Sequence, residues 1–182
     1  MKTQVVEALK TIILEFQENP YAFLYEEDIR ATLFHEIRKR LSDEVAVTGT
    51  GGPEQEYRLR GVYCEYGKKI DIACLNMDSQ IASEPYKGCD TFIYNIPVKI
   101  GIELKYRKMG DSFTFQESIK DYEKLKRNNV THCLAIAFVQ NDKELPDFLE
   151  PAAVEQADWS RFIENPDGIF VVTKTDILKL LV

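Results

Sequence analysis

Three charged residues, Asp71, Glu103 and Lys105, interrupt short apolar segments of the sequence. Residues 98–106 alternate between apolar and polar side chains, which is typical of a strand, and Glu103 and Lys105 fall on the same polar face. Asp71 lies inside a second apolar stretch, residues 69–75. A surface strand often carries Glu and Lys on its solvent side, so the polar face alone is compatible with either a solvated surface or a site.

These residue types predict a specific chemistry if the two strands are neighbours in one sheet. The carboxylates of Asp71 and Glu103 would then approach one divalent cation. Mg²⁺ takes oxygen ligands and keeps several waters, so two carboxylates and the backbone carbonyl of Leu104 would leave places for water and a phosphate oxygen. Lys105 could orient the attacking water and offset phosphate charge. The pattern therefore predicts metal-assisted hydrolysis of a phosphodiester.

Glu26 is a further candidate, on a helix predicted over residues 23–41. It lies on the same stripe as the apolar residues Ile29, Leu33 and Ile37. One interpretation places Glu26 at the exposed start of the helix, where an acid is favourable to the helix dipole. The other places it in a polar cleft at the rim of the core, where it could hold a metal-bound water or a second ion.

The surrounding sequence predicts one α/β domain over residues 1–182, with a mixed central sheet flanked by helices. Residues 111–127 form a helix capped by Asp111, Ser112 or Thr114, and residues 131–139 form a buried central strand reached by a parallel crossover. The other predicted elements are a helix over 3–17, strands over 57–66 and 69–76 joined as a hairpin, an extended excursion over 77–95, a helix over 154–164, a strand over 168–172 and a last helix over 175–181.

The order of these candidates resembles the PD-(D/E)XK nuclease superfamily, which has the restriction-endonuclease-like fold. The matching features are a helical Glu26, then Ile70-Asp71-Ile72, then Ile102-Glu103-Leu104-Lys105, then Gln116 on the following helix, and together they span about residues 20–140. The resemblance implies DNA cleavage, with RNA as another possible substrate. It also implies Mg²⁺ or Mn²⁺ held by Asp71, Glu103 and Leu104, and a catalytic set of Glu26, Asp71, Glu103, Lys105 and Gln116.

Three features depart from the pattern of that superfamily. Ile70 replaces the common proline before Asp71, and the gap from Asp71 to Glu103 is long. The spacing from Gln116 to Tyr122 is not the Gln-x-x-x-Tyr of RecB-like nucleases, so the role of Gln116 is the least secure. A non-catalytic binding or interaction module that keeps the fold, or a different metal-dependent phosphohydrolase, therefore stays open.

Charge and composition limit the partners. The net charge is −7, which opposes nucleic-acid binding in general. However, residues 96–130 carry eight basic and five acidic residues, whereas residues 142–167 carry two basic and eight acidic ones. We expect the groove at Lys105 to be bordered by some of Arg107, Lys108, Lys120 and Lys124, with the acidic segment elsewhere.

The sequence also predicts the cellular location of the protein. No apolar run approaches the roughly 20 residues that span a membrane, so no membrane partner is expected. Three of the four cysteines, Cys64, Cys74 and Cys133, lie in apolar runs, and the fourth is Cys89. Buried free thiols of this kind predict a cytoplasmic protein. Whether it acts as a monomer or a homodimer is open.

Overall fold

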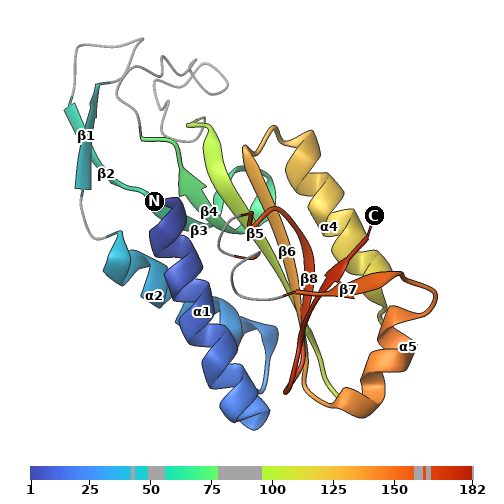
Figure 1. The fold of residues 1–182 in the computed structure, drawn as a ribbon. Helices are drawn as coiled ribbons and strands as arrows, with labels where there is room; N and C mark the ends of the chain where they lie inside the picture. The colour runs from blue at the N-terminus through green and yellow to red at the C-terminus, as the bar shows by residue number, and fades with distance from the viewer. Residues whose placement is uncertain (42–43, 49–55, 78–95, 158–161, 163–164, 182) are drawn as a thin grey trace.

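Seven strands form one mixed sheet in the computed structural model, which describes residues 1–41, 44–48, 56–77, 96–157, 162 and 165–181. The strand order is β3-β4-β5-β6-β8-β9-β7. The central strands β5 (Val98–Arg107), β6 (His132–Val139) and β8 (Gly168–Val172) run parallel, and the other neighbours are antiparallel. Helices α1 and α2 cover one face of the sheet and α4 covers the other (Figure 1). The predicted α/β fold with a mixed sheet flanked by helices is confirmed.

Helices α1 (Lys2–Glu18) and α2 (Glu26–Arg40) pack their apolar stripes against this sheet. Between them lies the short 3₁₀ helix η1 (Pro20–Ala22). The start of α2 falls three residues after the predicted Phe23, because the Asp28 carboxylate accepts the backbone N–H groups of Leu24 and Tyr25, each at 2.9 Å. This cap ends the extended segment at Tyr25 and makes Glu26 the first helical residue.

Helix α4 (Phe115–Arg127) connects β5 to β6 in the predicted parallel crossover. Thr114 is its N-cap, as one of the three candidates, and its hydroxyl accepts the N–H of Gln116 at 3.4 Å. The helix lies close to β5 because Gly101 has no side chain. A Cβ at Gly101 would be 2.7 Å from Leu125 of α4, which is closer than any real contact.

The single strand predicted over residues 57–66 is wrong, since the chain changes sheets in the middle of it. β2 (Glu56–Arg60) pairs with β1 (Glu44–Thr48) in a separate two-stranded sheet, and β3 (Val62–Glu65) pairs with β4 (Ile70–Leu75). Alternating side chains indicate a strand without showing which strand it pairs with. The antiparallel pairing of β3 and β4 confirms the hairpin, although its connection is the short helix α3 (Tyr66–Lys69). Residues 78–95 of the predicted excursion lie outside the described part.

The helix predicted over residues 175–181 is wrong, and so is the start of the helix predicted over residues 154–164, of which residues 158–161 and 163–164 lie outside the described part. After the 3₁₀ helix η3 (Asp142–Glu144) and the short α5 (Leu145–Leu149), β7 (Val154–Gln156) and β9 (Ile177–Leu180) form an antiparallel edge of the main sheet. Thr175 caps no helix. Instead, the Thr173 hydroxyl accepts the N–H groups of Thr175 and Asp176, and this turn sends the chain back along β8. Trp159, expected on the first of these helices, lies outside the described residues.

The described helices include none long and apolar enough to cross a membrane. Cys74 and Cys133 are buried free thiols, as expected. Cys64 is also a free thiol but is exposed, which corrects the prediction that it is buried, because β3 lies at the edge of the sheet. Cys89 is outside the described residues.

Candidate active site

The strand β5 extends beyond its neighbour β4, which leaves part of one edge without a strand partner. Pairing of the two strands ends at Ile72 and Ile102, whereas β5 continues to Arg107. Alternate residues of a strand present their backbone groups to the same side, so Leu104 and Tyr106 follow Ile102 in facing the β4 side. Carboxylate side chains bind this edge in place of a strand.

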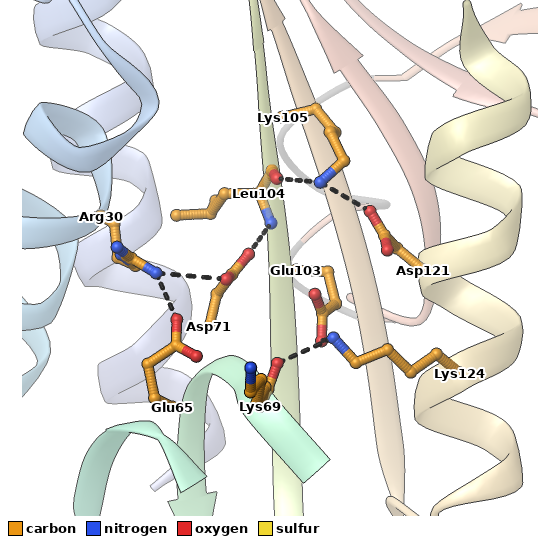
Figure 2. Close-up of polar contacts among 9 residues, drawn as sticks. All are labelled: Arg30, Glu65, Lys69, Asp71, Glu103, Leu104, Lys105, Asp121 and Lys124. Atoms are coloured by element: carbon orange, nitrogen blue, oxygen red, sulfur yellow. Dashed lines mark hydrogen bonds and ion pairs between the residues drawn. The ribbon is translucent and has the colours of Figure 1, made fainter.

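Asp71 binds the first of these backbone groups. Continuing the strand register by one residue places it opposite Glu103. Its side chain is 9% exposed, and Oδ2 accepts the N–H of Leu104 at 2.8 Å. The other oxygen, Oδ1, lies 3.4 Å from Nη1 of Arg30 on α2, and the same Arg30 nitrogen is 2.5 Å from Glu65 (Figure 2). Asp71 is therefore held by one backbone donor and one arginine.

Glu26 lies near the next backbone N–H along the same edge, that of Tyr106, and this donor slightly lowers the pKa of its carboxyl. Burial raises the pKa of the Glu26 carboxyl above its usual range, and the negative charge of Asp71 adds to this effect. The positive charge of Lys105 acts in the opposite direction. Because Glu26 is half-buried and lies within the electrostatic reach of both residues, the structure favours the polar-cleft interpretation over a solvated helix start.

Glu103 is the most deeply buried acid of the site, with 3% of its surface exposed. It is directed toward α4, where Nζ of Lys124 lies 2.8 Å from Oε1 (Figure 2). Oε1 is buried and is paired with this ammonium group, without a hydrogen bond from another described residue. The pKa of Glu103 is raised to about 7, mainly by burial and in part by the charge of Asp71, and contact with Lys124 limits the rise. The two carboxylates are thus close enough to repel one another.

Lys105 reaches back over the strand to the backbone carbonyl of Leu104. Its Nζ lies 3.2 Å from that oxygen and 2.9 Å from Oδ2 of Asp121 on α4 (Figure 2). Burial lowers the pKa of Lys105, but contact with Asp121 and the negative charge of Glu26 raise it more, so the net pKa is above its usual range. Lys105 therefore stays a cation beside Leu104, Glu26 and Asp71.

Gln116 does not join this group. It is exposed in the first turn of α4, and its side chain makes no contact with the described residues of the site, so its catalytic role stays a prediction. Among the expected border cations, Lys124 is at the site. Arg107 is instead buried and pairs with Glu144 at 3.3 Å, which brings one residue of the acidic segment to the far end of β5.

Two residues of the site, Arg30 and Asp121, were not anticipated from the sequence. Arg30 follows Glu26 by four residues, and Asp121 precedes Lys124 by three, so helical spacing places each beside a recognised candidate. That signal is weak, because most charged neighbours at such spacing are solvated pairs. Only the strand positions of Asp71 and Lys105 show that these two side chains point inward.

The donor set at this edge fits a hard divalent cation. All the donors are oxygens, from the carboxylates of Asp71 and Glu103 and the carbonyl of Leu104, and Oε1 of Glu103 is buried without a hydrogen bond. The described residues contain no group of three or more His, Cys, Asp or Glu side chains placed to hold a metal ion. Two carboxylates suit Mg²⁺, which usually keeps several waters.

Comparisons of the chain with models of known protein families, with curated proteins and with solved structures found no match. The case for a function therefore rests on the geometry of this edge and on the residue pattern.

Proposed function

We propose that this protein is a metal-dependent nuclease that hydrolyses phosphodiester bonds of DNA, as its resemblance to PD-(D/E)XK nucleases implies. The observation that carries the proposal is the open edge of β5. There Asp71 accepts the N–H of Leu104, Glu26 lies near the next N–H on this side, that of Tyr106, and Lys105 contacts the Leu104 carbonyl between them. Two acids and a lysine on one unpaired strand edge suit a reaction that handles a phosphate and a water.

In this proposal Asp71, Glu103 and the Leu104 carbonyl would hold Mg²⁺ or Mn²⁺. The bound ion would supply a more acidic water and neutralise charge on the phosphate. Lys105 orients the attacking water and offsets negative charge as the phosphate reacts. Glu26, with its raised pKa, is placed to hold or accept a proton from that water.

A second candidate is a binding module that keeps the fold without cleaving its partner. It is favoured by the pairing of Asp71 with Arg30 and of Glu103 with Lys124, since these cations already balance the two acids. A divalent cation would compete with both ion pairs. RNA in place of DNA would leave the same residues in the same roles.

The deciding experiment measures cleavage of labelled DNA and RNA with Mg²⁺, Mn²⁺ or EDTA. We expect metal-dependent cleavage by the wild type, none by Asp71→Asn, and a loss on the order of 10²-fold or more for Lys105→Ala. The control is Asp147→Asn, which removes an exposed acid from α5 and should cleave as the wild type does. Equal cleavage by wild type and Asp71→Asn, in preparations free of contaminating nuclease, would refute the proposed mechanism. DNA binding without any cleavage would select the binding module.

A further inference from the structure

A pocket with a basic lining lies between the C-terminal half of α2 and the strand β2. Its volume is about 390 Å³, and the residues that line it are Phe34, His35, Arg38, Lys39 and Arg60. Three of the five are permanent cations, one is histidine and none is acidic. The protein has a net charge of −7, so the positive charge of this pocket is opposite to that of the protein as a whole.

The cations of the pocket are supported by their surroundings. The Arg38 guanidinium lies 5.4 Å from the centre of the Phe34 ring, and Phe34 packs against the main core, so the charge is held at the wall of the pocket. Two acidic residues lie near the pocket, and each is paired with an arginine. Glu36 forms an ion pair with Arg40. Glu44 lies 3.6 Å from Arg60, in a pair that is half exposed on both sides.

The same helix joins this pocket to the candidate active site. Arg30, Phe34 and Arg38 follow one another at four-residue intervals and so lie along one side of α2. Arg30 contacts Asp71, and Arg38 lines the pocket. Eight residues of helix separate them by about 12 Å. This distance exceeds the separation of neighbouring phosphates on one strand, so the two points can contact different phosphates of the same strand.

We propose that the pocket binds a backbone phosphate of the substrate strand, a few nucleotides from the bond that is cut. The inference rests on the proposed nuclease function and adds a second point of attachment for the same substrate. Arg38, Lys39 and Arg60 supply the positive charge, and Phe34 holds Arg38 in place. Contacts with phosphate carry no sequence information, so the pocket positions the strand without selecting bases.

Fluorescence anisotropy in EDTA tests this binding without cleavage, with labelled single strands of two and eight nucleotides. For the eight-nucleotide strand, Arg38→Ala/Lys39→Ala should weaken binding at 0.1 M salt by roughly fivefold for each phosphate that the variant can no longer bind. The slope of log affinity against log salt should fall by about 0.7 for each such phosphate. The phosphate of the two-nucleotide strand can enter the pocket without reaching the candidate active site, so binding of this strand should also weaken in the variant.

The control is Arg127→Ala, which removes one exposed cation from α4, on the opposite face of the sheet (Figure 1). This substitution should change neither the affinity for the strands nor its dependence on salt. Glu44→Gln frees Arg60 from its acid and should strengthen binding of the longer strand, which a purely structural role of Arg60 would not produce. Arg38→Lys keeps the charge and should retain most of the salt dependence.

Unchanged binding of the longer strand by Arg38→Ala/Lys39→Ala, in a protein with the wild-type melting temperature, overturns the inference. A decrease in affinity for Arg127→Ala as large as that for Arg38→Ala/Lys39→Ala also overturns it, because it indicates a general effect of charge. Cleavage in Mg²⁺ by the same wild-type preparation tests the proposed function separately. If the wild type cleaves DNA but Arg38→Ala/Lys39→Ala binds the strands as tightly as the wild type, only this inference is refuted and the proposed function stands.

Discussion

The buried carboxyl of Glu103 should make the protein less stable as pH rises. Its folded-state pKa is about 7, against an ordinary value of 4.5, because burial penalises the charged form. Between these values the folded state binds a proton that the unfolded chain has lost, so the free energy of unfolding falls with increasing pH. The contribution of Glu103 is fully favourable below about pH 4.5 and is lost as pH rises through about 7.

The size of this effect follows from the two pKa values. From pH 5 to pH 8, the proton on Glu103 should account for a loss of about 2 to 3 kcal/mol in the free energy of unfolding. Glu103→Gln has the shape of the protonated side chain but does not titrate, so this part of the pH dependence should disappear. Other groups, such as Glu26, titrate in both proteins, and the difference between the two proteins isolates Glu103.

The measurement is denaturant unfolding at several pH values from 5 to 8, in EDTA to remove divalent cations. We expect Glu103→Gln to be less affected by pH and to exceed the wild type in stability at pH 8. Parallel curves for the two proteins across this range would refute the reasoning, since they would show that Glu103 ionises normally. In Mg²⁺ the wild type should regain stability most strongly at high pH, where the proton no longer competes with the ion.

Two further substitutions test the packing around the site by denaturant unfolding. Gly101→Ala should cost roughly 1–3 kcal/mol, because its Cβ would lie 2.7 Å from Leu125, whereas Gly61→Ala meets nothing closer than 3.8 Å and should cost less. A Gly101→Ala protein as stable as Gly61→Ala would contradict the close approach of α4. Tyr106→Phe removes the hydroxyl that donates to the Phe23 carbonyl at 2.6 Å and should cost about 1 kcal/mol, and no loss would show that water replaces this bond.

The core helices and strands of this fold can be predicted from the sequence because their patterns of apolar residues are long. The stripe of α1, the alternation of β5 and the apolar run of β6 each extend over eight or more residues, and each predicted element is confirmed. The errors fall on short segments. Apolar residues at Ile177 and Leu180 fit helical spacing as well as a half-buried strand, and only the turn at Thr173 decides between them.

The candidate site shows a similar division between what the sequence contains and what only the fold supplies. Asp71, Glu103 and Lys105 are visible because each is a charge within a strand pattern. Their ion-pair partners come from helices that pack on opposite faces, Arg30 from α2 and Asp121 from α4. No spacing rule links a strand residue to a helix residue about 40 or 16 positions away, so these pairs depend on the tertiary structure.

The overhang of β5 beyond β4 has a consequence for self-association. Unpaired N–H groups at a sheet edge are a template on which a strand from another molecule can add, and this is a route to aggregation. Asp71 accepts the N–H of Leu104 and Glu26 lies near that of Tyr106, and the negative charge of these acids repels an approaching strand. The same acids that we place at the reaction centre therefore also keep neighbouring copies apart, so evolutionary loss of catalysis need not release either carboxylate from selection.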